Sequence, residues 1–376
     1  AGKITAITRG AKRVFQTLEI RLSHSNNHVS FSNFKKKNPE SYSQDEARKL
    51  LIESGMWTVI RQRPFNTAPQ TTSTPHSLFV STLDTNPLSL NPRLVIGERL
   101  EEFKAGLKVL SSFPKHKLYL CKDLENIELP DLKNLKPVEV SGIHPAGNVG
   151  THIHFLEPVS LEKSVWHVGY QDVIAIGHLF LRGKLDEERY VSLAGPRVKN
   201  PRILKTRRGA NLDELLEGEI DDPSSTRVIS GSILNGRTKD KTFRFLGQFD
   251  HQISCIEEDN IRALLGWHSP GINLYSQKRI YLSKLLFGKK FSLGSSTHGS
   301  PRAMVPTGSF EEVTPLDILP TQLLRSLLSH DTDQAQALGC LDFAEEDLAL
   351  YTFVSPGKID FGPVLRENLA KIEKEG

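Results

Sequence analysis

Leu78-Phe-Val-Ser-Thr-Leu83 is the stretch that decides the fold class, because its mostly apolar run predicts a strand. Leucine and phenylalanine then recur at helical spacing over residues 100–110, and Lys117-Leu-Tyr-Leu-Cys121 predicts the next strand. A strand, a helix and a strand in such close succession are typical of a parallel sheet with crossover helices. The sequence therefore predicts a Rossmann-like α/β domain around this stretch.

The alternation continues towards the C-terminus. Val138-Glu-Val140 predicts a strand, residues 168–181 predict a helix, and Tyr190-Val-Ser-Leu193 predicts a further strand of the same domain. Asp84-Thr-Asn-Pro87 follows the first strand where a dinucleotide-binding domain would carry a glycine-rich turn. Ordinary NAD binding by this domain is therefore not expected. GxxxxGK[ST], HExxH and GxSxG are absent as well, which leaves NTPase, zinc protease and hydrolase functions without their usual motifs.

Two short strands are predicted on the N-terminal side, over residues 1–10 and 14–22. Since two strands are not stable by themselves, we expect either an upstream remainder of a small β domain, removed from this chain, or pairing with a later sheet. Ser43-Gln-Asp-Glu46 is a capping box that predicts the start of a helix, and residues 66–75, rich in Thr, Pro and Ser, predict a linker.

A second α+β unit is predicted from Arg197 onwards. Arg202–Thr206 and Arg227–Ser230 predict strands on either side of a short helix that Asn211 caps. This succession suggests a β-grasp-like module, extended by Gln252–Glu257. The tail is predicted to be helical, with Pro320 in a first turn and a leucine stripe behind it.

The composition is that of a folded chain without redox metal centres. The 376 residues contain 38% hydrophobic side chains and suffice for two or three domains. The longest apolar run, residues 173–181, is too short to span a bilayer. Cys121, Cys255 and Cys340 lie more than 80 residues apart, so an iron–sulfur cluster or a zinc ribbon is not expected. The odd number of cysteines favours a reducing compartment.

The net charge of +4 conceals a gradient along the chain. Residues 1–69 carry +7 (12 Lys and Arg, 5 Asp and Glu), and residues 311–376 carry −8 (5 against 13). Residues 260–310 contain neither Asp nor Glu. A solvated face is the plain interpretation of such a run, and a surface for an acidic partner or anionic headgroups is the alternative. No nucleic-acid-binding motif accompanies it, so nucleic acid is not an expected partner. The candidate docking residues are Lys278, Arg279, Lys284, Lys289 and Lys290.

The motif with the richest chemistry is Gly142-Ile-His-Pro-Ala-Gly-Asn-Val-Gly-Thr-His-Ile-His-Phe155. If its His-x-His lay on a strand, both rings would share one face and could bind a metal. With no thiol and few carboxylates nearby, a hydrogen-bonded loop at a domain or subunit junction is favoured, and a pocket for a small redox molecule is the third possibility. Candidate residues for a quinone pocket or an interface are His144, Gly147, Gly150, His152, His154, Phe155 and Trp166. No catalytic residue and no metal ligand is predicted.

Several strings resemble one family, the A subunits of bacterial Na+-translocating NADH:quinone oxidoreductases. They are spread over the whole chain and include Gly10–Arg13, Glu53–Trp57, Arg63–Phe65, Asp84–Leu88, His144–Leu156, Tyr170–Val173, Ser192–Pro196, Ile229–Ser232, Met304–Pro306, Glu345–Leu350 and Lys371–Gly376.

The resemblance implies a peripheral, cytoplasm-facing subunit of an inner-membrane pump that oxidises NADH, reduces ubiquinone and exports Na+. It implies the other subunits, B to F, as partners, mainly the membrane-embedded B subunit, with ubiquinone as a possible ligand. Flavins and iron–sulfur centres are then expected on the partners, and no cofactor is expected to be bound covalently here. The alternative is a stand-alone quinone- or small-ligand-binding Rossmann-like protein or oxidoreductase.

The resemblance also implies a layout like that of the flavoprotein subunit of respiratory complex I, without its flavin loop and cluster cysteines. The expected domains are a remnant of a biotinyl/lipoyl-like barrel-sandwich β domain (1–30), a helical segment and linker (31–75), a Rossmann-like domain (76–195), a β-grasp, soluble-ligand-binding module with a basic extension (196–310) and a C-terminal helical domain (311–376).

Overall fold

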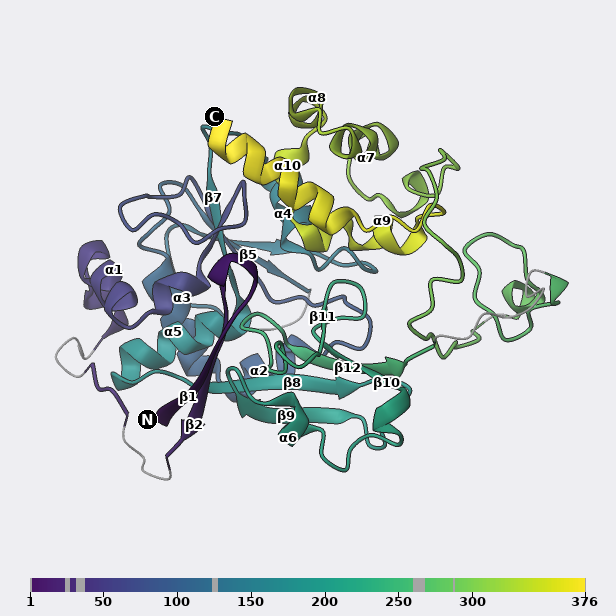
Figure 1. Cartoon of the computed structure of the whole chain (residues 1–376). Helices are drawn as coiled ribbons and strands as arrows, with labels where there is room; N and C mark the ends of the chain where they lie inside the picture. Colours follow the sequence, from purple (N-terminus) through teal and green to yellow (C-terminus); the bar gives the residue numbers. More distant parts are fainter. Residues whose placement is uncertain are drawn as a thin grey trace.

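A five-stranded sheet stands at the centre of the N-terminal half of the fold, in the order β3-β7-β4-β5-β6. The computed structural model describes residues 2–23, 28–31, 38–123, 128–259, 268–286 and 288–375 (Figure 1). The prediction of a parallel sheet is confirmed for β4 to β7, while β3 pairs antiparallel with β7 at one edge. The strands are β3 (Arg61–Arg63), β4 (Leu78–Ser81), β5 (Leu118–Lys122), β6 (Leu135–Glu139) and β7 (Val165–Gly169).

Helices cover both faces of this sheet. The larger core lies on the face that carries α1 (Gln44–Glu53), α2 (Pro92–Glu98), α3 (Leu100–Leu110) and α5 (Tyr170–Arg182). The predicted capping box at Ser43 is present at the start of α1. α3 and α5 approach closely at Gly177. A Cβ atom there would lie 1.7 Å from the carbonyl oxygen of Glu102, so this approach requires glycine. α4 (Val149–Leu156) covers the opposite face, where Ile153 packs in a smaller core with Phe79 and Val165.

The second sheet corrects one sequence prediction. Its order is β11-β10-β12-β8-β9, with β12 parallel to β8 and the other neighbours antiparallel. The strand predicted at Tyr190–Leu193 is therefore part of this sheet and not of the first one. The segment predicted as an extension is β12, which lies inside the sheet. The elements are β8 (Glu188–Ala194), β9 (Arg202–Arg207), α6 (Leu212–Leu215), β10 (Thr226–Ser230), β11 (Arg237–Thr238) and β12 (Gln252–Glu257).

The C-terminal helices pack around a core of their own, which confirms the helical prediction for the tail. Leu323, Leu324 and Leu327 lie in it, together with Leu365 and Leu369. The helices are α7 (Pro320–Leu328), α8 (Thr332–Ala337), α9 (Ala349–Val354) and α10 (Phe361–Glu375). Short 3-10 helices are η1 (Ala11–Arg13), η3 (Pro39–Ser41), η4 (Met56–Val59), η5 (Pro223–Ser225), η7 (Leu282–Leu285), η8 (Glu311–Val313), η9 (Cys340–Asp342) and η10 (Glu345–Leu348).

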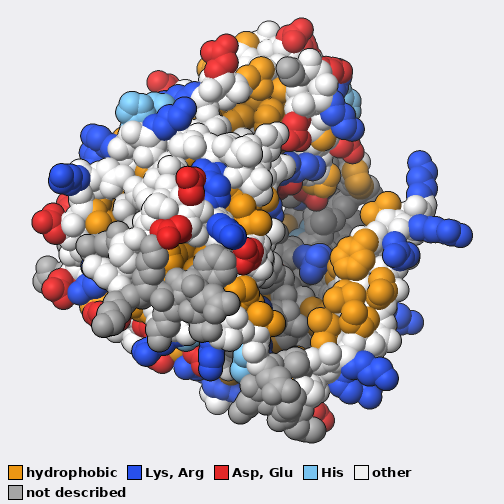
Figure 2. All heavy atoms as spheres, turned by 90° about the vertical axis from the view of Figure 1, so that its left-hand side faces the viewer, with side chains coloured by type: hydrophobic (Ala, Val, Ile, Leu, Met, Phe, Trp, Pro, Cys, Tyr) orange, Lys and Arg blue, Asp and Glu red, His pale blue; other side chains and the backbone are white. Residues whose placement is uncertain are grey.

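The two predicted N-terminal strands are β1 (Gly2–Arg9) and β2 (Phe15–Leu22), which form an antiparallel hairpin. Among the described strands they pair only with each other. Apolar side chains of the hairpin remain exposed, among them Ile4, Ile20 and Leu22. The hairpin crosses in front of the body in Figure 1. In Figure 2 it forms the arm at the right-hand side of the picture, where hydrophobic side chains (orange) are bordered by Lys and Arg (blue).

Residues 268–286 and 288–291 follow the second sheet in the sequence and are called the basic segment. They project away from the body as the green excursion at the right of Figure 1. Of the described part of the segment, only η7 is helical, and no side chain of it belongs to one of the hydrophobic cores. In the described chain, no helix has the length and apolarity needed to cross a membrane.

Candidate functional site

The glycine- and histidine-rich loop predicted as a site lies between the first sheet and the C-terminal helices. The loop runs through residues 142–148 and enters α4, so that the His-x-His pair is helical and not extended. Positions two apart on a helix do not share a face. The geometry that would place both rings on one metal ion is therefore not formed.

Two glycines of the loop are explained by close contacts. A Cβ atom at Gly147 would lie 2.7 Å from Oγ1 of Thr85, which accepts a hydrogen bond from the Gly147 amide at 2.9 Å. A Cβ atom at Gly150 would lie 2.3 Å from Oδ2 of Asp347. A Cβ atom could not lie at either distance, so these glycines allow close packing of the loop. They do not leave an open backbone pocket for a ligand.

The three histidines of the loop each have a polar partner. Nδ1 of His144 lies 3.3 Å from Thr85 Oγ1, and Nε2 of His152 lies 2.7 Å from the carbonyl oxygen of Ala146. Burial lowers the pKa of His144 and of His152, against the attraction of Asp347 for a proton. Both rings are therefore neutral near pH 7. Nδ1 of His154 lies 2.9 Å from Oδ2 of Asp342 in the C-terminal unit.

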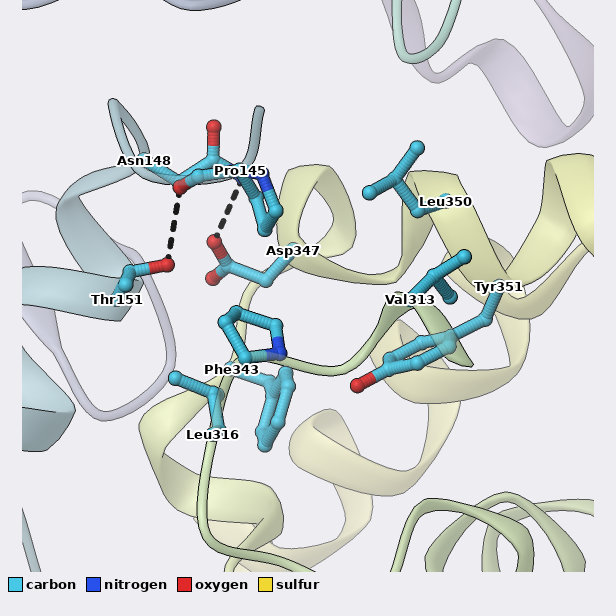
Figure 3. Close-up of a pocket in the computed structure, with 10 residues that line it drawn as sticks. Pro145, Asn148, Thr151, Val313, Leu316, Phe343, Asp347, Leu350 and Tyr351 are labelled. Atoms are coloured by element: carbon cyan, nitrogen blue, oxygen red, sulfur yellow. Dashed lines mark hydrogen bonds between the residues drawn. The ribbon is translucent and has the colours of Figure 1, made fainter. Parts of the chain in front are cut away.

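Asp347 joins three parts of the chain. Its Oδ2 atom accepts hydrogen bonds from both terminal nitrogens of Arg63, each at 3.1 Å, and from the amide of Ala344 at 2.9 Å. Its Oδ1 atom accepts a bond of 3.2 Å from Asn148 at the start of α4 (Figure 3). Arg63, at the end of β3, has no exposed surface. A buried charge needs such a partner, so this ion pair locks the first sheet, the loop and η10 together.

A second ion pair lies beside the first one. Arg366 of α10 binds both carboxylate oxygens of Glu345, at 2.6 and 2.7 Å, and also the carbonyl oxygen of Phe65. Between the two pairs lies Glu346, whose Oε1 atom is 3.3 Å from Arg63. Burial, followed by the charge of Asp347, raises the pKa of Glu346 to about 7, against the effect of Arg63. The side chain of Glu346 keeps 37% of its exposure, so solvent screens part of this shift.

Two further histidines have lowered pKa values, and the charge of Arg63 acts on one of them. Burial and the charges of Arg63 and Arg61 hold the pKa of His167, on β7, well below its usual range. Burial and Arg189 lower the pKa of His251 to about 4, against Asp84. His251 precedes β12 and contacts the ring of Tyr170 at 5.1 Å. The second sheet therefore also reaches the edge where β4 and β7 end.

The structure does not bring all the predicted site residues together. Trp166 alternates with Val165 on β7 and therefore faces the sheet surface opposite α4. It is fully buried there, edge-on to Trp57 at 5.4 Å, so the predicted role as a wall of the loop pocket is wrong. Phe155 is 59% exposed and Ile143 is 90% exposed. These two apolar side chains lie at the two ends of the loop and α4.

A small cavity lies where the loop meets the C-terminal helices. Figure 3 shows Pro145, Asn148 and Thr151 on one side, and Leu316, Phe343 and Tyr351 on the other. Its volume is about 10 Å³, which is room for roughly one water molecule. A quinone ring does not fit into the cavity in this conformation. A larger hollow of about 140 Å³ lies elsewhere, next to Tyr42 and Lys108.

The predicted docking residues all lie on the basic segment but differ in their contacts. Lys278 pairs with Glu312, and Lys289 donates to the carbonyl oxygen of Ile272 at 2.6 Å. The ammonium of Lys284 lies 5.9 Å from the ring centre of Tyr275. No described carboxylate pairs with Lys284 or with the two other cations, Arg279 and Lys290.

The three thiols lie in three different cores. Cys121 is on β5, Cys255 is on β12, and Cys340 is in η9. Burial raises the pKa of each thiol to about 12. Within the described ranges, no three His, Cys, Asp or Glu side chains are grouped so that they could hold a metal ion.

Sequence reasoning missed Arg63, Asp347, Arg366, Glu345 and Glu346 as a site. One signal for them exists, because the basic N-terminal stretch and the acidic tail carry opposite charge. Part of this gradient is complementarity within the chain, since Arg63 of the basic stretch pairs with Glu346 and Asp347 of the acidic tail. The arrangement is a rigid polar junction, and its groups are already paired with one another.

Two family models match the chain. The model described as the NqrA second alpha/beta domain matches residues 42–185. The model described as the NQRA C-terminal domain, an SLBB model, matches residues 190–241. Among solved structures, a chain of the NAD+-reducing [NiFe]-hydrogenase in the air-oxidized state matches 61% of this chain and 49% of its own length, with a TM-score of 0.43 and 14% identity. A likeness of this size does not define the fold.

Curated relatives match from end to end. The chain is 49% identical over 378 residues to the A subunit of the Na(+)-translocating NADH-quinone reductase from Alcanivorax borkumensis. It is 50% and 48% identical to the corresponding A subunits from Histophilus somni and Pseudomonas aeruginosa. In all three cases the match covers 100% of this chain and 84% of the relative.

Proposed function

Because this chain belongs to the family of A subunits of the Na+-translocating NADH-quinone reductases, a multi-subunit oxidoreductase, we propose that it is a peripheral subunit on the cytoplasmic side of an inner membrane. It acts there as a scaffold in a Na+-pumping NADH:ubiquinone oxidoreductase. The observation that carries the proposal is the identity of about one half along the complete chain. The flavins and iron–sulfur centres belong to the partner subunits, B to F.

Within this role, residues 42–185 are a Rossmann-like domain and the second sheet is a β-grasp module. The order of strands β6-β5-β4-β7, all parallel, supports the first assignment. The missing glycine-rich turn after β4 supports a scaffold without a bound dinucleotide.

Two surfaces of the chain face the membrane-embedded part of the complex, mainly its B subunit. One is the exposed end of the loop and of α4, with Ile143 and Phe155. The other is the basic segment, which projects from the body in Figure 1 and carries five cations. Exposed apolar side chains next to a rigid polar junction suit an interface, because such side chains lose little conformational freedom on binding.

The test is assembly of the complex. The Ile143→Ser and Phe155→Ser variants are expected to lose co-purification with the other subunits, whereas Leu94→Ser, on the equally exposed surface of α2, is not. Cross-links from Lys284, Lys289 and Lys290 to other subunits are expected in the intact complex, and their absence would contradict the placement of the basic segment.

The isolated chain is expected to show no NADH:quinone turnover. Substantial activity of the chain alone would overturn the scaffold role and favour a stand-alone quinone-binding oxidoreductase.

A contribution to the ubiquinone site is the second candidate function of the loop. The cavity beside it combines apolar walls, Phe343 and Leu316, with the polar groups of Asn148 and Thr151, as a quinone headgroup requires. Binding would need the C-terminal helices to move away from the loop. A photoreactive azido-quinone should then label residues 143–156 or the facing helices, and labelling confined to other regions or subunits argues against this role.

A further inference from the structure

The basic segment is a folded projection and not a loose loop. The amide of Leu282 donates to the carbonyl oxygen of Pro270 at 2.9 Å, and the buried hydroxyl of Ser283 donates to that of Leu274 at 2.5 Å. The ring of Tyr275 packs on Phe291 and, in the C-terminal unit, on Phe353, each at 5.8 Å. Its outer surface is therefore presented in a defined shape.

Aliphatic side chains form much of that outer surface. Ile280 is 72% exposed and Leu285 is 68% exposed, and Ile272, Leu282 and Leu286 are also exposed. Such a concentration of branched apolar side chains on one projection is not expected of a surface that remains in water.

The charge around these side chains has one sign. Five cations lie between residues 278 and 290, and the stretch from residue 260 to residue 310 contains no Asp or Glu. Of the described acids, Glu312 alone is paired with one of the five, through Lys278. The exposed apolar side chains thus lie on the same segment as cations that no described carboxylate neutralises, among them Lys284 and Lys290.

This composition fits a lipid surface better than a protein surface. Protein interfaces are depleted in lysine and depend on aromatic and arginine anchors. Four of the five cations are lysines, and the exposed apolar groups are mainly aliphatic. Lysines around aliphatic side chains are typical of segments that lie in the headgroup region of anionic membranes, because their long stems stay in apolar surroundings while the ammonium reaches the phosphates.

We propose that the basic segment binds the surface of a bilayer that contains anionic lipid, with Ile280 and Leu285 entering the boundary between headgroups and acyl chains and Arg279, Lys284 and Lys290 contacting headgroup phosphates. This inference rests on the proposed function, which places the chain beside a membrane, and it names the lipid as a partner of its own.

The experiment is sedimentation of the purified chain with vesicles of phosphatidylcholine, with and without roughly one third phosphatidylglycerol. Binding is expected to the anionic vesicles only and to weaken with salt. The Arg279→Gln/Lys284→Gln/Lys290→Gln variant should bind roughly 100-fold more weakly, since each cation near such a surface contributes about a factor of five. Ile280→Ser/Leu285→Ser should lower the affinity roughly tenfold or more.

Matched controls separate the segment from the rest of the surface. Lys115→Gln/Lys117→Gln/Lys241→Gln removes three exposed lysines elsewhere and should leave binding nearly unchanged. Because all these side chains are exposed, the far-UV circular dichroism should match that of the unaltered chain. Equal binding by the segment variants and the controls would overturn the proposal, since the vesicles would then be bound elsewhere, for instance by the N-terminal hairpin.

Insertion is tested with a fluorophore. In the Leu285→Trp variant, brominated phosphatidylcholine in the anionic vesicles should quench the new emission, whereas Leu94→Trp on α2 should show no additional quenching. Absence of vesicle binding while the complex still assembles, with Lys284 cross-linked to another subunit, would replace the lipid by a protein partner and leave the proposed function intact. If the chain bound vesicles but did not assemble with the other subunits, the lipid proposal would hold and the proposed function would be overturned.

Discussion

Arg63 and Asp347, 284 positions apart in the chain, form an ion pair in which both terminal guanidinium nitrogens lie 3.1 Å from one carboxylate oxygen. Arg63 is completely buried and Asp347 retains 6% of its side-chain exposure. The pair connects the edge strand of the first sheet to the C-terminal helices. Because both side chains are buried, this pair stabilises the contact between the two parts of the chain.

Removing one partner of this pair should be costly. Asp347→Ala leaves the charge of Arg63 buried without its main partner and should lower the free energy of unfolding by about 3 kcal/mol or more. The measurement is urea denaturation of both proteins. Lys49→Ala, which removes an exposed pair with Glu53, should cost at most about 0.5 kcal/mol and serves as the control. A similar small loss for both variants would contradict the role assigned to the junction.

Gly150 should not tolerate a methyl group. In Gly150→Ala the new Cβ atom would meet the Asp347 carboxylate, and such overpacking typically costs about 1–3 kcal/mol. Gly97→Ala is the matched control, because no atom lies within 4 Å of its Cβ position on α2. This control should be neutral or stabilising by up to about 1 kcal/mol, since alanine favours helices. Thermal melting of both variants measures the difference.

Glu346 should make the stability depend on pH. Its pKa is about 7 in the folded chain against an ordinary value of 4.5, so the folded state holds the proton more tightly. Stability from this group is present below pH 4.5 and is lost as the pH rises towards about 7. Glu346→Gln removes the effect, so the variant should gain stability relative to the unaltered chain between about pH 5 and about pH 8. A difference that stays constant with pH would exclude this titration.

All three thiols should be unreactive in the folded chain. Each is fully buried, and burial raises its pKa to about 12, so thiolate is scarce at about pH 8. A colorimetric thiol reagent at that pH should find none of Cys121, Cys255 and Cys340 at early times, and all three in urea. Prompt release of one equivalent from the native chain would show that a core opens locally.

Substitution of Trp166 should lower the free energy of unfolding far more than substitution of Phe155. Trp166→Ala opens a hole in the largest core and should cost about 3–5 kcal/mol. Phe155→Ala removes an exposed ring and should change the stability of the isolated chain by at most about 0.5 kcal/mol. Urea midpoints of the two variants test this. A large loss for Phe155→Ala would show that the ring stabilises the chain itself.

Local patterns predicted most individual elements because their causes are local. The capping box at Ser43, the helical spacing over residues 100–110 and the apolar residues of β4 and β12 depend on neighbours within a few positions. The assignment of β8 to the first sheet failed, since a strand carries no mark of the sheet that it joins. Its partners, β9 and β12, are chosen by packing.

The sequence by itself determined the alternation of strands and helices, the family, the acid-free stretch and the isolation of the three cysteines. Only the tertiary structure decided that His154 meets Asp342, that Trp166 faces away from the loop, and that Arg63 meets Asp347. The physical reason is distance along the chain. A helix or a cap is stabilised by residues within one or two turns, whereas a buried ion pair between positions 63 and 347 forms only after separate cores have packed against one another.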